Sequence, residues 1–116
     1  MSYLTFNHGQ DFDVHVGEVL SANGNTAAAD MAVNSARKVV AIVTSTVAGS
    51  SAKLQGSNDN TTWTDIGSSV AVEANETKVL ETYNPGYRYV RVNVTLGGEG
   101  SMAAHIFTTG YRAHRG

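Results

Sequence analysis

The side chains best suited to chemistry in this chain are its histidines and one pair of closely spaced acids. The four histidines are His8, His15, His105 and His114. Their separations match no ligand set typical of zinc or iron, so we interpret them as solvent or interface side chains. Asp11 and Asp13 lie on one side of a predicted strand. Paired carboxylates can hydrolyse glycosides, but only inside a cleft that binds the sugar, so the pair indicates a polar strand face instead.

Other motifs that mark enzymes and cofactor sites are missing from the sequence. The chain has no cysteine, which excludes disulfides and thiolate metal sites. The segment TVAGSSA lacks the G-x-S-x-G nucleophile pattern, and GGEG is not followed by a predicted helix that could hold a phosphate. The segment DNTTWTD is not an EF-hand calcium loop, although a looser calcium site in SNDN stays open. We therefore expect neither an enzyme nor a cofactor.

Composition narrows the class of protein further. The 116 residues suit one domain, since domains commonly span about 100–150 residues. The net charge of −2 argues against a nucleic-acid partner, because such proteins usually carry a basic field. The sequence shows neither a membrane span nor a secretory signal peptide, so we expect synthesis in the cytoplasm and no membrane partner. Charged residues are 16% of the chain, against about 25% usually, which suits a β-protein rich in turns or one that packs against neighbours.

Alternating apolar and polar residues indicate β-strands along most of the chain. The segment YRYVRVNVTL places Val90, Val92 and Val94 on one face, and Tyr89 and Arg91 on the other. We expect the first face to meet a core and the second to meet water or a partner. The segment DFDVHVGEVL also alternates. The segment RKVVAIVTSTV is apolar on both sides and predicts a central strand that is covered on both faces.

Turn-forming clusters separate these strands at short intervals. The clusters NGN, GSNDN, NPG and GGEG combine the residues that turns favour. The segments between them predict an all-β protein of about eight strands, arranged as two antiparallel sheets face to face. We expect residues 1–10 to form an N-terminal arm or an edge strand, and residues 11–116 to form a single β-sandwich domain.

The only tryptophan, Trp63, follows the turn in the segment KLQGSNDNTTWTDIGSSV. Asn58 and Asp59 can bond their own backbone and so close that turn. We expect Trp63 to lie on the returning strand, where a buried indole ring would anchor the hairpin against the sheet. The alternative is a ligand platform, in which Tyr83 and Tyr87 join Trp63 at one end of the sandwich.

Two segments together resemble a known group of proteins. LQGSNDNTTWTDIGS and YRYVRVNV are similar to the S-N-D-G-x-x-W hairpin and the R-Y-V-R-V strand of discoidin-like and carbohydrate-binding jelly rolls. The same pair of motifs occurs in small β-sandwich proteins of tailed-bacteriophage virions. Asn60 stands where these proteins often have Gly, a mild departure because Asn also accepts a positive φ. The resemblance implies a jelly-roll-like sandwich.

The resemblance to phage proteins also implies a function. It favours a capsid decoration or cement protein, made in the host cytoplasm and carried on the capsid surface of the virion. Such proteins bind the major capsid protein, often as trimers, and brace the shell. Two alternatives remain: a carbohydrate-binding module of a tail or adhesin protein, and a structural subunit of the tail or neck. An isolated fold does not decide among these functions.

The two ends of the chain carry opposite charges. Residues 1–36 contain four acids and no Lys or Arg, whereas the last stretch, HIFTTGYRAHRG, contains two Arg and no acid. This asymmetry suits contact between identical copies or docking on a second protein, although a chance imbalance among few charges would look the same. Together with the apolar residues near the N-terminus, it gives a set of candidate interface residues: Tyr3, Leu4, Phe6, Tyr111, Arg112 and Arg115.

Overall fold

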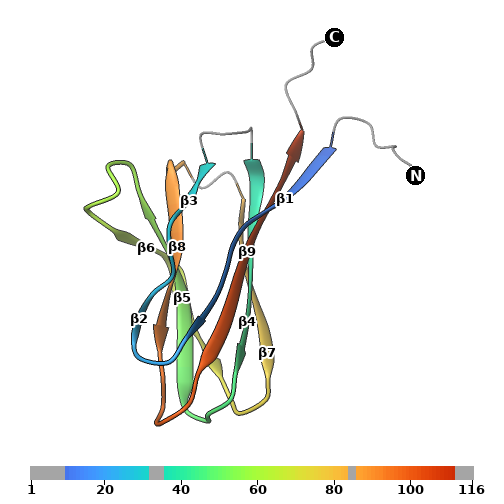
Figure 1. The fold of residues 1–116 in the computed structure, drawn as a ribbon. Helices are drawn as coiled ribbons and strands as arrows, with labels where there is room; N and C mark the ends of the chain where they lie inside the picture. Colours follow the sequence, from blue (N-terminus) through green and yellow to red (C-terminus); the bar gives the residue numbers. More distant parts are fainter. Residues whose placement is uncertain (1–9, 32–35, 84–85, 112–116) are drawn as a thin grey trace.

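The structure is a computed structural model that describes residues 10–31, 36–83 and 86–111. The regular elements of this part are β-strands, numbered β1 to β9 along the chain (Figure 1). It contains no helix long and apolar enough to cross a membrane. The predicted all-β class is therefore confirmed.

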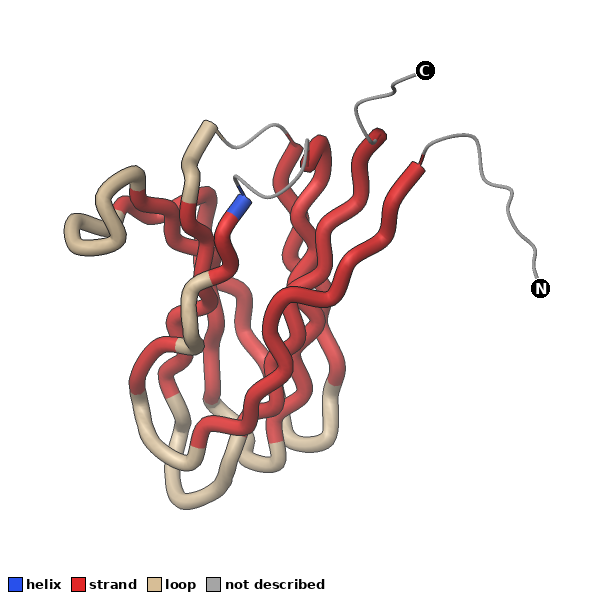
Figure 2. Tube along the Cα trace, turned by 45° about the horizontal axis from the view of Figure 1, so that its top comes forward, coloured by secondary structure: helices blue, strands red, loops and turns tan. Residues whose placement is uncertain are grey.

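The strands form two sheets in which all neighbouring strands run antiparallel. The first sheet has the order β1 (Gln10–Leu20), β9 (Met102–Tyr111), β4 (Ala36–Ser45), β7 (Thr77–Tyr83). The second sheet has the order β2 (Gly24–Asn25), β8 (Tyr89–Thr95), β5 (Ser50–Ser57), β6 (Thr64–Val72), and β3 (Ala29–Asp30) also pairs with β8. In Figure 2 the loops (tan) gather at the ends of the strands.

This strand order is that of a jelly roll, which has about eight strands in two sheets. The additional strand arises because one edge strand is divided into β2 and β3, which both pair with β8. Between them the backbone N–H of Thr26 donates to the Val92 carbonyl at 2.9 Å, and the Thr26 hydroxyl accepts from the Val92 N–H at 3.1 Å. The buried hydroxyl of Thr26 thus replaces one acceptor of the backbone hydrogen-bond ladder with β8. The strand order confirms the predicted jelly-roll-like sandwich.

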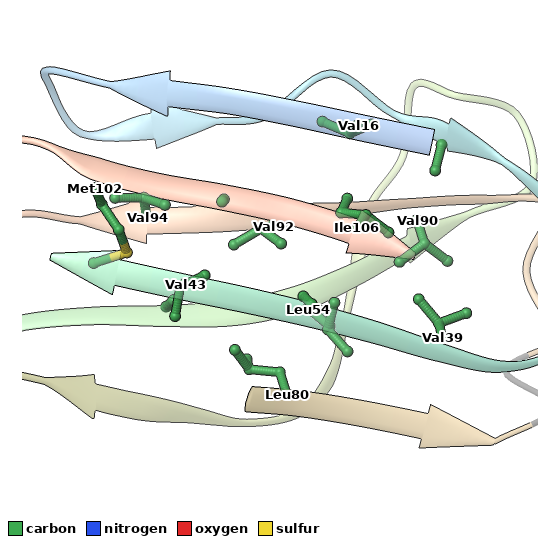
Figure 3. Packing of buried hydrophobic residues seen from close by; sticks show 14 of the residues in the cluster. Val16, Val39, Val43, Leu54, Leu80, Val90, Val92, Val94, Met102 and Ile106 are labelled. Atoms are coloured by element: carbon green, nitrogen blue, oxygen red, sulfur yellow. The ribbon is translucent and has the colours of Figure 1, made fainter. Parts of the chain in front are cut away.

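The core lies between the sheets and is filled from alternate positions of the strands. In β8, Val90, Val92 and Val94 are at most 1% exposed, while Tyr89 and Arg91 are half-buried on the outer side, as the sequence predicts. Figure 3 shows side chains of both sheets meeting in this layer. Further core residues at 2% exposure or less are Ala29, Val39, Ala41, Val43, Ala52, Leu54, Val72, Met102, Ala104 and Ile106.

The strand β4 is central, between β9 and β7, but only one of its faces is covered. Val39, Ala41 and Val43 are fully buried, whereas Val40 and Ile42 on the other face are only half-buried. The expectation of cover on both faces is therefore wrong. A jelly roll has two layers, so no third layer among the described residues covers the outer side of β4. Apolar residues on that side need another explanation.

Candidate contact surfaces

The outer face of the first sheet carries a group of exposed apolar side chains. In the described part, the exposed large hydrophobic side chains are Val19, Val79 and Tyr83, at 63%, 51% and 62% exposure. Their strand register places all three on this outer face. Single exposed apolar residues are common, but a group on one surface marks a site of interaction.

The cross-strand register places further apolar side chains beside Val79 on this outer face. Ile42 of β4 stands between Val79 of β7 and His105 of β9. Val40 of β4 stands beside Phe107 of β9. Directly opposite residues in antiparallel strands have their Cβ atoms about 5 Å apart, so the side chains form one surface. We call this surface the apolar face, and its members are Val19, Val40, Ile42, Val79, Tyr83 and Phe107.

Charged side chains beside the apolar face form an ion pair with each other. Lys38 Nζ lies 3.1 Å from Glu81 Oε2 and 5.2 Å from the centre of the Tyr83 ring. The hydrogen bond to Glu81 raises the pKa of Lys38 above its usual value. His105 lies on this face with its ring stacked on Phe107, at a centroid distance of 6.4 Å. It is exposed and lies opposite the buried residues of β9, as the sequence predicts.

Most of the predicted interface residues lie outside the described residues: Tyr3, Leu4, Phe6, Arg112 and Arg115. The backbone of Tyr111 ends β9 and pairs with Gln10, the first residue of β1. Figure 1 shows β1 beginning and β9 ending side by side. Both predicted interface segments are therefore joined to one end of the sheet that carries the apolar face.

The outer face of the second sheet is polar, and its side chains are paired across the strands. Arg91 Nε donates to Gln55 Oε1 at 2.9 Å, and Gln55 Nε2 donates to Asp65 Oδ1 at 3.0 Å. Lys53 Nζ lies 3.2 Å from Asp65 Oδ2. The hydrogen bond from Gln55, followed by that from Lys53, lowers the pKa of Asp65. We call this surface the polar face; it consists of Lys53, Gln55, Trp63, Asp65, Tyr89, Arg91 and Asn93.

Trp63 belongs to the polar face and not to the core. The guanidinium carbon of Arg91 lies over the indole ring, 4.0 Å from its centre, and the ring is half-buried. β6 begins at Thr64, so Trp63 precedes the returning strand on which the sequence placed it. Ile66 packs against the core instead. The expected burial of the ring is therefore corrected: Trp63 is half-buried and lies against Arg91 on the outer side of the sheet.

Hydrogen bonds of the turn itself hold the hairpin. Asp59 Oδ1 accepts from the backbone N–H groups of Thr61 and Thr62 at 2.9 and 2.8 Å, and from the Ser57 hydroxyl at 2.9 Å. These bonds, led by those from Thr62 and Thr61, lower the pKa of Asp59 to about 2. Asn60 has a φ of 61°, the positive value that the sequence allowed there. Asp59 is thus the organising residue of this turn.

The aromatic rings proposed as a ligand platform do not share one surface. Tyr87 packs on the inner side of β5, because a Cβ on Gly56 would collide with its ring, and Gly56 alternates with the outward Gln55. Trp63 lies on the outer side of that strand, against Arg91. Tyr83 lies on the other sheet. The structure therefore brings none of the three together.

The described residues offer little material for metal binding or for catalysis. No group of three or more His, Asp or Glu side chains among them could hold a metal ion. One hollow of about 270 Å³ is lined by the turn and by Tyr87. Another of about 190 Å³ lies between β6 and β7 and is lined by Ile66, Val70 and Leu80, among others. Neither contains a convergent set of titratable groups.

Sequence reasoning missed most members of both faces. Val79 and Val40 had no role in it beyond strand formation, and Gln55 and Asp65 were not singled out. The alternation of TKVLETY contained a usable signal, because Val79 and Tyr83 share a face with Thr77 and Glu81. The partnership of Arg91 with Gln55 had no such signal, since 36 positions separate the two residues.

The strand order and the shared core define the class of this protein as a jelly-roll β-sandwich. No protein-family model and no curated protein matches the sequence. Solved structures share the fold at low identity. The SPBc2 prophage-derived protein YomS is 12% identical, with a TM-score of 0.66 over 94% of this chain and 100% of its own.

Further structures extend this likeness. The PBSX exported protein XepA is 16% identical, with a TM-score of 0.67 over 99% of this chain; the present chain spans only 42% of its length. The coat protein of Tobacco streak virus is 10% identical, with a TM-score of 0.57 over 98% of this chain and 94% of its own. A family 29 carbohydrate-binding module from Piromyces equi also shares the fold.

Proposed function

We propose that this chain is a structural protein of a tailed-bacteriophage virion, and specifically a decoration or cement protein of the capsid. The observation that carries the proposal is the apolar face, in which Val19, Val79 and Tyr83 are more than half exposed on the outer side of one sheet. The fold likeness to a prophage-derived protein and to a viral coat protein supports the virion setting. The sequence motifs around Trp63 and Arg91 support it independently.

The mechanism is burial of the apolar face against the major capsid protein. Removing a Val or Phe side chain fully from water contributes about 1.5–3 kcal/mol. A face with several such residues, of which Val19, Val79 and Tyr83 are more than half exposed, can stabilise a contact although area alone does not set affinity. A standard interface buries about 1,600 Å² in total. Repeated over many copies, contacts of this size would stiffen a shell.

The chain ends add to the same contact. Residues 1–9 and 112–116 continue from the end of the first sheet where Gln10 pairs with Tyr111. Their apolar and basic residues would extend the contact beyond the sheet, to the capsid protein or between copies in a trimer. Under this proposal the protein is made in the host cytoplasm and resides on the outer capsid surface.

A carbohydrate-binding module is the weaker candidate. Jelly rolls include such modules, but the sequence argument for one here needed Trp63, Tyr83 and Tyr87 at one end of the sandwich. Those rings lie on three different surfaces. The geometry therefore favours a protein contact through the apolar face over a sugar-binding site formed by these aromatic rings.

The test is co-sedimentation of the purified protein with empty capsids of the virus that carries it. Val79→Asp places a charge on the apolar face and should weaken attachment about tenfold or more, because desolvating an unpaired carboxylate is costly. Ala71→Asp is the matched control, since Ala71 is also exposed on an edge strand but on the other sheet. Equal attachment of both variants would overturn the proposal.

A further inference from the structure

Arg91 differs from the other cationic side chains whose surroundings the structure describes. Lys38, Lys53, Lys78 and Arg88 each lie within 3.5 Å of a carboxylate oxygen. Arg91 has no carboxylate partner in this part of the chain, although it is half-buried. Burial lowers the pKa of Arg91 from its usual value, yet an arginine stays protonated at neutral pH. The polar face thus holds one partly desolvated, uncompensated positive charge.

The guanidinium of Arg91 is held in one orientation. It is carried by β8, which lies inside the second sheet between β5 and the divided edge strand. Its Nε donates to Gln55, and the flat group lies on the indole ring of Trp63. An arginine has five N–H donors, and the bond to Gln55 is the hydrogen bond that Arg91 makes among the described residues. The terminal amino groups therefore remain available to an acceptor.

Asp65, the acid nearest to Arg91 along this row of outward side chains, is already paired. Asp65 accepts from Gln55 and from Lys53, one on each oxygen. The Gln55 side chain stands between Asp65 and Arg91 and bonds to both. Arg91 can gain a carboxylate from within the row only if Asp65 leaves Lys53. A carboxylate from another protein can bind the terminal amino groups of Arg91 without breaking the ion pair between Lys53 and Asp65.

We propose that Arg91, backed by Trp63, is the docking point for a carboxylate side chain of a protein partner. A fixed guanidinium can bind a carboxylate through two parallel hydrogen bonds, and a ring behind it keeps water from one side. Trp, Tyr and Arg are the residues most enriched at the centres of protein interfaces, and Trp63, Tyr89 and Arg91 share this face. The proposal concerns a different surface from the apolar face and stands whether or not that face binds a capsid.

The shape of the surface favours a protein partner over a sugar acid. Small ligands bind in concave sites that enclose most of their surface. Neither hollow described above is lined by Trp63 or Arg91. The donor stands on the outer side of a sheet, where another protein surface can lie across it.

The test uses the fluorescence of Trp63, the only tryptophan of the chain. The full-length protein is titrated at low salt with the blocked peptide acetyl-Glu-Asp-Glu-Asp-amide and with its neutral counterpart, acetyl-Gln-Asn-Gln-Asn-amide. We expect a saturable change with the acidic peptide, and affinity for the neutral peptide lower by about tenfold, since charge-assisted hydrogen bonds are the stronger ones. Equal affinity for the two peptides would overturn the proposal.

Variants separate Arg91 from general positive charge. Arg91→Gln should weaken binding of the acidic peptide about tenfold, and Arg91→Lys should restore it in part, because a lysine keeps the charge without the two-pronged geometry. Arg88→Gln is the matched control: it removes the same charge from an arginine that already pairs with Asp30, and should change the affinity less than about twofold. Circular dichroism confirms that each variant is folded. If Arg91→Gln binds like the wild type, or if D-glucuronate binds and the acidic peptide does not, the proposal fails.

Discussion

The guanidinium of Arg91 lies 4.0 Å above the centre of the Trp63 ring, on the outer side of the sheet formed by β8 and β5. This relationship decides what the lone tryptophan does. Trp63 covers the guanidinium of Arg91 on the outer surface of the second sheet. The turn is held by the hydrogen bonds of Asp59, and the core is filled by aliphatic residues. The consequences can be measured residue by residue.

Replacing Trp63 should have a modest effect on stability. Trp63→Ala loses a cation–π contact and some half-buried area, so we expect the free energy of unfolding to fall by about 1–2 kcal/mol. Leu54→Ala provides the comparison, because Leu54 is 2% exposed and its truncation should cost about 2–5 kcal/mol. Urea denaturation measures both. An equal loss of stability in Trp63→Ala and Leu54→Ala would indicate that the Trp63 ring is a core residue and would contradict its place on the outer side of the sheet.

Gly56 should resist substitution because Tyr87 lies directly on it. A Cβ at this position would collide with the Tyr87 ring, so Gly56→Ala should lower the free energy of unfolding by about 1–3 kcal/mol through overpacking. Gly24→Ala is the control, since nothing lies within 4 Å of a Cβ built there. Thermal unfolding of the two variants should therefore differ clearly. Equal melting temperatures would contradict the packing of Tyr87.

Asp59 should make the hairpin sensitive to acid. The folded state lowers the pKa of Asp59 from 3.8 to about 2, so its contribution is present above the ordinary pKa and is lost as the pH falls toward the lowered one. We expect the melting temperature to drop between those two values, and Asp59→Asn to reduce this drop while lowering stability at neutral pH. Glu99→Gln, which removes an exposed carboxylate from the loop before β9, should leave the drop unchanged. An identical acid response in the Asp59 variant would be the contrary result.

Removing residues 1–9 should separate folding from attachment. β1 begins at Gln10, so the shortened chain keeps every described strand and should give the circular dichroism spectrum of the intact protein. Its attachment to capsids should weaken, because the apolar residues Tyr3, Leu4 and Phe6 are lost. Full attachment of the shortened chain would exclude a role for this segment and leave the contact to the apolar face alone.

The fold followed from local patterns that the sequence displays directly. The alternation around Val92 placed the core side of β8 correctly, and Asn60 took the positive φ that its turn needs. The side of the sheet occupied by Trp63 depended on packing that a propensity cannot reveal, because its partner Arg91 is distant in sequence. Val40 and Ile42 were taken for buried residues, since β-branched residues look alike whether a second layer or a partner protein covers them.

The most direct test of the central claim is an electron-microscopy reconstruction of capsids decorated with this protein, at a resolution that separates the two sheets. We expect the sheet with Val79, Ile42 and Phe107 to face the shell and the polar face to turn away from that contact. If the apolar face instead points to solvent while another surface touches the shell, the account of this protein as a cement held by that face is wrong.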